Sequence, residues 1–125
     1  MSQYGDLTTP MPSDEFPTTY MYRNVPRKCT VWSLLSEIEL YACRSSVNFV
    51  YVPWDKKTTK TMGYAFVNFV DPVVAWQVCQ RMDNRYWRTV VHKREMRVAP
   101  AKMQGLKANL ERYTQAGEPD EGHFP

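Results

Sequence analysis

Apolar residues recur along this chain with two different periods, and each period predicts a different kind of element. Four stretches alternate between apolar and polar positions, as strands with one buried face do, and two stretches repeat apolar residues at i, i+3, i+4 and i+7, as amphipathic helices do. The strand-helix-strand-strand-helix-strand order predicts an α+β ferredoxin-like sandwich, a four-stranded antiparallel sheet with both helices on one face. In chain order the elements are a strand at 19–25, a helix at 31–41, strands at 47–53 and 62–69, a helix at 72–82 and a strand at 95–101.

Capping signals mark the ends of both predicted helices. Thr30 is a suitable N-cap for the first helix, and Asp71 followed by Pro72 supplies an N-cap and a first-turn proline for the second. Asn84 is able to end the second helix in a left-handed conformation. The expected buried faces are Val31, Leu34, Leu35 and Ile38 in the first helix and Ala75, Val78, Cys79 and Met82 in the second.

The period of two also divides each strand into an inward and an outward face. Because the helices cover only one face of the sheet, the other face meets water, and aromatic rings there can stack on unpaired bases for ~1–3 kcal/mol per base. The expected inward residues include Tyr20, Tyr22, Val50, Val52, Ala65, Val67, Phe69, Met96 and Val98. The expected outward residues are Met21, Arg23, Phe49, Tyr51, Tyr64, Phe66, Asn68, Arg97 and Ala99.

The segments on either side of the module at 18–101 differ from it in composition. Residues 1–17 are rich in Pro, Ser, Thr and acidic side chains and predict a disordered arm, and residues 116–125 predict an acidic disordered tail. Residues 102–115 predict an extra helix, which must bury its apolar stripe on the flank of the module, over the outward face as a lid, or against another protein. Flank packing is the favoured placement. The stripe consists of Met103, Leu106, Leu110 and Tyr113.

Charge is distributed unevenly along the chain. The net charge is +3, but all 16 Lys and Arg residues lie between Arg23 and Arg112, together with only seven of the 13 acidic residues. The middle of the chain therefore carries a net charge of +9. A basic module of this kind favours a polyanionic partner and predicts salt-sensitive binding.

Composition favours neither a metal site, nor an enzyme, nor a membrane span. Cys29, Cys43 and Cys79 lack metal-ligand spacing and are expected to be reduced thiols of an intracellular protein, in the nucleus or the cytoplasm. No apolar run approaches ~18 residues, and no nucleophile lies in a recognisable pattern with a base. We therefore expect no cofactor and no membrane association. Trp32, Trp76, Tyr86 and Trp87 are expected to be packing residues, and His92 and His123 surface residues.

Residues 62–69, Met-Gly-Tyr-Ala-Phe-Val-Asn-Phe, resemble the ribonucleoprotein octamer of an RNA-recognition motif at seven of its eight positions. The departure is Met62, because the first position is usually a Lys or Arg that contacts phosphate. Lys56, Lys57 and Lys60 in the preceding loop are able to supply that charge. The resemblance implies an RNA-recognition motif at 18–101 that binds single-stranded RNA.

A larger part of the chain resembles one family, the C-terminal RNA-recognition motif of the mei-two-like meiosis regulators. That family has Met at the first-strand position where a stacking aromatic is usual. The resemblance implies a domain of a longer post-transcriptional or meiosis-type regulator. It covers about 18–113 and rests on Met21-Tyr22-Arg23-Asn24-Val25-Pro26, Tyr51-Val52-Pro53-Trp54-Asp55, the octamer, Trp87 and Ala101-Lys102-Met103-Gln104-Gly105.

The candidate RNA-binding residues combine rings, cations and one amide. Tyr64 and Phe66 are predicted to stack on bases, and Asn68 to contact a base edge. Tyr51 and Trp54 would extend this surface, while the cations would pair with phosphates. The full set is Met21, Arg23, Tyr51, Trp54, Lys56, Lys57, Lys60, Tyr64, Phe66, Asn68, Arg97 and Lys102.

Two other functions remain open. If the helix at 102–115 occludes the sheet, the module is a protein-protein interaction domain, and the same helix is a candidate contact for a protein partner. Arg23-Asn24 also resembles the anion-binding pair of small phosphatases with this strand order, although no nucleophile-base pair accompanies it. Solvent exposure of Tyr64 and Phe66 separates RNA binding from the protein-interaction alternative.

Overall fold

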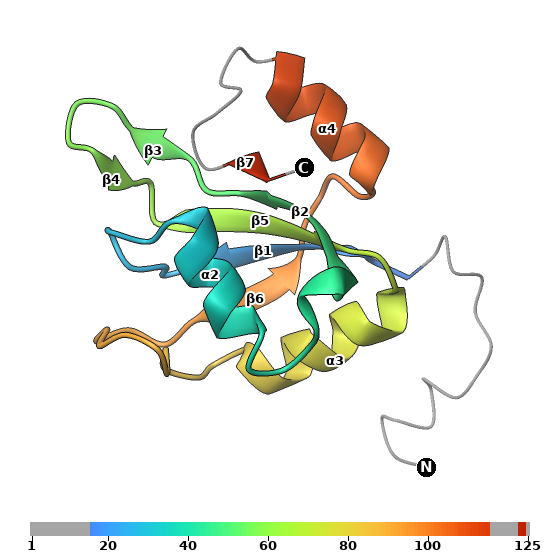
Figure 1. The fold of residues 1–125 in the computed structure, drawn as a ribbon, viewed down its shortest axis with the longest axis horizontal. Coiled ribbons are helices and arrows are strands. Elements are labelled where there is room, and N and C mark those ends of the chain that lie inside the picture. The colour runs from blue at the N-terminus through green and yellow to red at the C-terminus, as the bar shows by residue number, and fades with distance from the viewer. Residues whose placement is uncertain (1–15, 116–122, 125) are drawn as a thin grey trace.

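Four antiparallel strands form a sheet with two helices on one face in this computed structural model, which describes residues 16–115 and 123–124 (Figure 1). The order across the sheet is β6-β1-β5-β2, with a short strand β7 added beside β2. The predicted α+β sandwich is therefore confirmed. The elements are β1 (Thr19–Arg23), α2 (Val31–Ile38), β2 (Val47–Tyr51), β5 (Tyr64–Phe69), α3 (Pro72–Met82) and β6 (Arg97–Pro100).

The core lies between the sheet and the pair α2 and α3. Leu34, Leu35 and Ile38 of α2 are fully buried, as the helical period predicts. Burying an aliphatic side chain of this size stabilises the fold by ~1.5–3 kcal/mol. Tyr22 is also fully buried, and its hydroxyl donates to Sδ of Met82 at 3.4 Å. The predicted inward faces of the strands are confirmed as well.

Local capping sets the starts of both helices. Thr30 forms a capping box with Ser33: the Ser33 amide donates to Thr30 Oγ1 at 3.1 Å, and the Thr30 amide donates to Ser33 Oγ at 2.8 Å. Asp71 accepts a hydrogen bond from the Val73 amide at 2.8 Å. The first helix ends three residues earlier than predicted, because the amides of Leu40 and Tyr41 donate to carbonyls three residues back and tighten the chain into turns.

A β-bulge in β2 places aromatic residues on the face of the sheet opposite α2 and α3. Val47 pairs with Phe69, whereas Phe49 pairs with Asn68, so the register shifts at the intervening residue. The extra residue turns Val47 towards the core and Phe49 to the opposite face, although the two are separated by an even number of positions.

The predicted lysine loop is a two-stranded ribbon, β3 (Trp54–Asp55) and β4 (Lys60–Thr61). Thr59 adopts a left-handed conformation with φ of 55° at the turn between them, and its amide donates to the carbonyl of Asp55 at 2.7 Å. Trp54 packs against the core. The ribbon extends beyond the sheet at one corner of the molecule (Figure 1).

A helix that follows β6 lies on the face of the sheet that α2 and α3 leave open (Figure 1). The helix α4 (Leu106–Gln115) begins later than the predicted residue 102, because residues 101–105 form a turn in which Gly105 has φ of +99°. β7 (His123–Phe124) pairs antiparallel with β2. These two residues are the described part of the tail predicted to be disordered at 116–125. The predictions for 1–15, 116–122 and the His123 side chain fall outside the described part of the chain.

Candidate functional site

Three apolar side chains form a platform on the open face of the sheet. Met21 of β1 pairs with Phe66 of β5. Tyr64, two positions before Phe66 on β5, pairs with Arg23 of β1. The rings of Tyr64 and Phe66 meet edge-to-face with centroids 5.7 Å apart and an interplanar angle of 76°. All three side chains are half-buried, so part of each remains accessible. We call Met21, Tyr64 and Phe66 the platform.

The helix α4 covers the neighbouring part of the same face. The ring of Tyr113 stacks on Tyr51 with a centroid distance of 4.2 Å, and it also lies 5.8 Å from Phe66 and 6.0 Å from Phe49. Tyr51 is buried and Phe49 fully so. The favoured flank packing of the extra helix is therefore wrong. Tyr51 fits poorly as a predicted base-stacking residue, because Tyr113 already occupies its face.

Buried hydrogen bonds hold the start of α4 on the sheet. The Thr19 hydroxyl donates to Asn68 Oδ1 at 2.6 Å, and its oxygen accepts from the Gly105 amide at 2.9 Å and from Asn109 Nδ2 at 3.2 Å. Gln104 closes the set, with Oε1 accepting from the Thr19 amide at 2.9 Å and Nε2 donating to the Thr19 carbonyl at 2.8 Å. We call these residues the Thr19 network. A buried network with its donors paired favours one position of the helix.

Asn68 does not have the predicted position for reading a base. Its side chain lies within the Thr19 network and is 2% exposed. Oδ1 accepts from the hydroxyls of Thr18 and Thr19, and Nδ2 donates to Oδ1 of Asn48 at 2.8 Å. The alternation placed Asn68 on the correct face, but its amide is engaged in holding α4.

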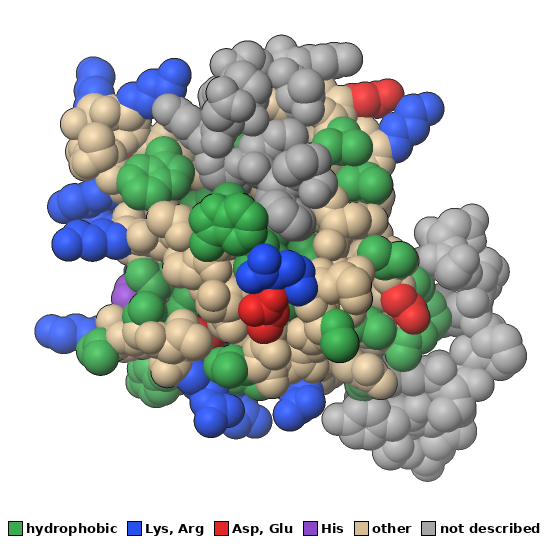
Figure 2. Space-filling view, viewed as in Figure 1, with side chains coloured by type: hydrophobic (Ala, Val, Ile, Leu, Met, Phe, Trp, Pro, Cys, Tyr) green, Lys and Arg blue, Asp and Glu red, His purple; other side chains and the backbone are tan. Residues whose placement is uncertain are grey.

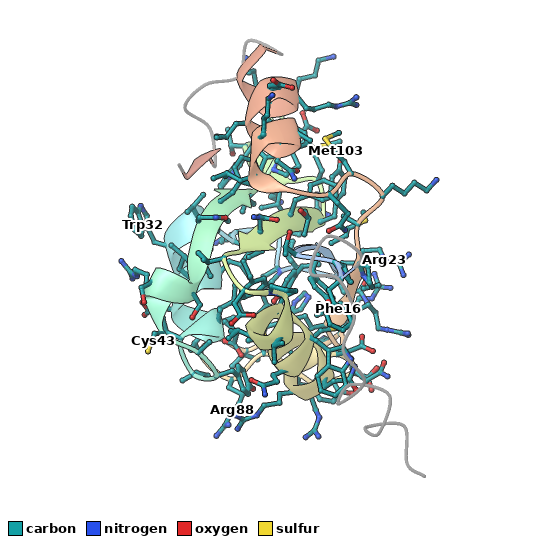
Figure 3. All side chains as sticks on the ribbon, turned by 90° about the vertical axis from the view of Figure 1, so that its right-hand side faces the viewer. Phe16, Arg23, Trp32, Cys43, Arg88 and Met103 are labelled. Atoms are coloured by element: carbon teal, nitrogen blue, oxygen red, sulfur yellow. The ribbon has the colours of Figure 1, made fainter. Side chains whose placement is uncertain are left out.

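A groove of about 510 Å³ opens between α4 and two platform residues, Met21 and Phe66, while Tyr64 lies outside its lining. This volume is in the range of sites that enclose a small organic group. Three cations border it: Arg23 from β1, Lys102 from the turn before α4, and Arg112 from α4. The remaining walls comprise Met21, Phe66, Ala99, Pro100, Ala101, Met103 and Tyr113. Figure 3 shows Met103 near the base of α4 and Arg23 on the same side of the molecule.

The other predicted cations lie farther from the platform. Lys56 and Lys57 are exposed at the tip of the β3–β4 ribbon, and Lys60 is half-buried in β4. Lys and Arg side chains gather along that side of the molecule (Figure 2). Arg97 pairs with Asp83, with Nε and Oδ1 3.4 Å apart. This ion pair partly neutralises Arg97, which makes it a weaker candidate than Arg23. Trp54 is also a weaker candidate for RNA contact, because it packs against the core.

Sequence reasoning did not identify Met103, Arg112 and Tyr113 as site residues. Met103 and Tyr113 were recognised as part of an apolar stripe, but the stripe alone does not reveal which surface it covers. Desolvation raises the pKa of the Tyr113 hydroxyl despite the opposing effect of Arg112, so this ring is a neutral phenol at physiological pH. Two packing predictions were also wrong, since Trp32 is 57% and Tyr86 56% exposed.

The described part of the chain holds no candidate metal site, and two of its three cysteines are buried. No group of three or more His, Cys, Asp or Glu side chains in it could hold a metal ion. Burial raises the pKa of the Cys29 and Cys79 thiols to about 11, so both are protonated and weakly nucleophilic. Within the same residues, no helix has the length and apolar character needed to cross a bilayer.

Sequence comparison matches most of the chain to one family. The family model described as RNA recognition motif 2 covers residues 17–115. Protein MEI2-like 2 of Oryza sativa subsp. japonica is 30% identical over 108 residues, which are 86% of this chain and 13% of that protein. Protein MEI2-like 2 of Arabidopsis thaliana is 31% identical over 110 residues, 88% of this chain and 13% of that protein. The chain thus spans about an eighth of these relatives.

Structural comparison finds the same architecture in solved structures. The Rna15 RRM with bound RNA (GU) has a TM-score of 0.62 and 13% identity, over 79% of this chain and 98% of that one. A Sex-lethal protein/RNA complex has a TM-score of 0.58 and 20% identity, over 71% of this chain and 49% of that one. At these identities the likeness establishes the fold.

Proposed function

Because this chain belongs to the RNA recognition motif 2 family and resembles the MEI2-like proteins over most of its length, we propose that it binds single-stranded RNA through the groove between the platform and α4. The observation that carries the proposal is the pair Tyr64 and Phe66, which remain half-buried beside a groove with three cations at its border. The resemblance also supports the proposal that the module works within a post-transcriptional or meiosis-type regulator.

Base stacking supplies the apolar part of the proposed binding. The accessible surface of Phe66 opens into the groove, and Tyr64 continues the platform towards Arg23. Stacking of one base on an aromatic side chain contributes ~1–3 kcal/mol and tolerates any base. Met21 offers a polarisable apolar surface without a π system. The platform therefore favours unpaired bases over a duplex, in which the base faces are hidden.

Cations supply the electrostatic part. Arg23, Lys102 and Arg112 approach the groove from three different elements, so a strand that enters it has phosphate partners on several sides. For single-stranded nucleic acid, each phosphate contact makes the logarithm of the binding constant fall by ~0.7 for each unit rise in the logarithm of the salt concentration. Lys56 and Lys57, which are exposed on the ribbon, would act on a longer strand that leaves the platform.

Two structural neighbours support the proposal by analogy. The structures described as the Rna15 RRM with bound RNA (GU) and as a Sex-lethal protein/RNA complex share the fold of this chain. Shared fold alone does not establish shared function. The two RNA complexes favour RNA among the polyanions that a basic surface attracts.

A titration with fluorescein-labelled, randomised single-stranded RNA at two salt concentrations tests the proposal. The expected result is salt-dependent binding that falls by at least tenfold in the Tyr64→Ala, Phe66→Ala double variant. The matched control is Trp32→Ala, an exposed aromatic on α2, which should bind like the parent. Thermal melting of each variant verifies folding. If the parent and the double variant are both folded and bind RNA equally, the platform is not the site of base stacking.

The second candidate is a protein-interaction domain. The observation that favours it is Tyr113, whose stacking on Tyr51 shows that part of the open face already serves helix docking. In that case RNA affinity should be weak and insensitive to the platform variants. The same titration therefore separates the two functions.

A further inference from the structure

The loop between α3 and β6, residues 83–96, is anchored to the helix layer by a buried carboxylate. Glu37 of α2 is fully buried, and its two oxygens accept hydrogen bonds from this loop. Oε2 accepts from the Arg88 amide at 2.7 Å, and Oε1 accepts from the amide and hydroxyl of Thr89 at 3.0 and 2.6 Å. Backbone and side chain together hold this part of the loop in one conformation.

A second set of contacts holds the loop near its end. The carbonyl of Asn24 accepts a hydrogen bond from Nε2 of His92 at 2.9 Å, which places the proton on that nitrogen. Asn24 Nδ2 in turn donates to the carbonyl of Glu95 at 2.9 Å. Arg85 and Met96 pair across the base of the loop. His92 was predicted to be a surface residue, but it is half-buried and structural.

Although it is anchored on both sides, the loop presents two aliphatic side chains to water. Val91 is 100% exposed and Val90 is 41% exposed. They lie between Thr89 and His92, which are both hydrogen-bonded to the body of the protein. Their exposure therefore follows from a defined loop conformation, and it leaves apolar surface ready to be buried by a partner.

The two valines border a cleft of about 390 Å³ between this loop and the β1–α2 connection. The opposite wall includes Pro26, Arg27 and Lys28, and none of the described residues that line the cleft is acidic. Trp87 forms part of the wall and is 5% exposed. Its indole Nε1 is buried and has no hydrogen-bond partner among the described residues. Apart from Ser33 and His92, the cleft therefore combines apolar surface with a cationic rim.

We propose that this cleft binds an extended peptide segment of a partner protein, one that carries an aliphatic side chain flanked by acidic residues. The aliphatic side chain would pack on Val90 and Val91, and the acidic residues would pair with Arg27 and Lys28. A peptide suits the cleft better than RNA, because the exposed apolar contacts here are aliphatic, whereas unpaired bases stack on aromatic rings.

The cleft is separate from the groove proposed for RNA. The two share no lining residue, and Arg88 of the loop lies at the end of the molecule opposite α4 (Figure 3). Cys29 lines the cleft, but burial keeps its thiol protonated, which favours binding over covalent chemistry. The protein would thus be able to hold RNA and a protein partner at the same time.

Selection of random 12-residue peptides displayed on phage, with the full chain as bait, tests the proposal. The expected enrichment is an aliphatic residue flanked by Asp or Glu. An enriched peptide, labelled for fluorescence anisotropy, should lose at least about tenfold in affinity for the Val90→Ser, Val91→Ser variant. Both substitutions are on exposed side chains, so the variant is expected to fold.

Two further variants separate this site from the RNA site. Arg27→Glu, Lys28→Glu should abolish peptide binding, whereas Tyr64→Ala, Phe66→Ala should leave it unchanged. The proposal is overturned if no acidic-aliphatic peptide is enriched, or if enriched peptides bind the valine variant like the parent. It is also overturned if the valine variant weakens single-stranded RNA and peptide alike, since the cleft would then belong to the RNA surface. Loss of RNA binding in the platform variant alone leaves the peptide site standing.

Discussion

The two halves of the open sheet face have similar side chains but different surroundings. Over β2, Phe49 and Tyr51 are buried beneath Tyr113 of α4. Over β1 and β5, Met21, Tyr64 and Phe66 remain half-buried, and Met21 and Phe66 border the groove. The difference teaches that an outward aromatic in this fold is available to a ligand only where no other segment has already covered it.

Asn68 and Phe66 differ in the same way within one strand: the first is covered and the second is accessible. Both point to the open face, two positions apart on β5. Asn68 lies in the Thr19 network under the start of α4, whereas Phe66 faces the groove. We infer that one end of β5 serves helix docking and the other serves ligand binding, and the following variants test that division.

The largest effect on stability is expected from Asn68→Leu. Without the amide, the buried Thr19 hydroxyl loses its acceptor, and a buried group left unpaired costs ~1–3 kcal/mol. The half-buried side chains of Thr18 and Asn48 also lose a partner, which adds to the loss. Urea unfolding measures the change. Lys107→Ala, an exposed position on α4, is the control. RNA affinity of the folded fraction should change little; a loss as large as that of the platform variant would restore Asn68 as a base contact.

Tyr113→Ala should affect both halves of the face. The stack on Tyr51 is lost, and a favourable aromatic pair contributes ~0.5–1.5 kcal/mol beyond its burial. We expect lower stability and a loss of RNA affinity smaller than that of Tyr64→Ala, Phe66→Ala, because Tyr113 forms one wall of the groove. Unfolding and anisotropy titrations measure the two changes. Tighter RNA binding would mean that α4 competes with bases for the platform.

Charge removal should distinguish groove cations from paired ones. Arg23→Gln and Arg112→Gln are each expected to reduce the slope of log K against log salt by ~0.7. Arg97→Gln should reduce it less, because Arg97 already pairs with Asp83. Titrations at four salt concentrations measure the slopes. Equal slopes for the Arg23 and Arg97 variants would contradict the assignment.

The smallest effect is expected in alkaline solution. The pKa of Tyr113 is raised from 10.0, so folding favours the neutral phenol, and its contribution is present below pH 10 and is lost as pH rises through the raised pKa. The parent should therefore lose more stability between pH 9 and pH 11 than Tyr113→Phe. Urea unfolding at both pH values measures this difference. An identical loss in both proteins would place the sensitivity at other groups.

Local sequence signals were sufficient for most of the module. Thr30 and Asp71 predicted the helix starts, and the period of two assigned Tyr22, Met21 and Phe66 to the correct faces. Local signals did not predict features that depend on contacts between distant segments of the chain. Thr19 and Asn109 are 90 positions apart and meet under α4, and no local pattern encodes that encounter. Trp32 was predicted to be a packing residue, but it is exposed. Its position on α2 does not by itself reveal which side of the helix is covered.

By itself the sequence determined the order of elements, the basic character of the module and the set of residues that share the open face, because alternation, helical period and caps act over a few residues. Only the tertiary structure decided which of those residues are covered. The docking of α4 depends on pairing Thr19, Asn68 and Asn109 in one buried network and on stacking Tyr113 against Tyr51. Such long-range pairings select one placement for a stripe that several surfaces would accept, and they divide one aromatic face into a docking half and a half open to ligand.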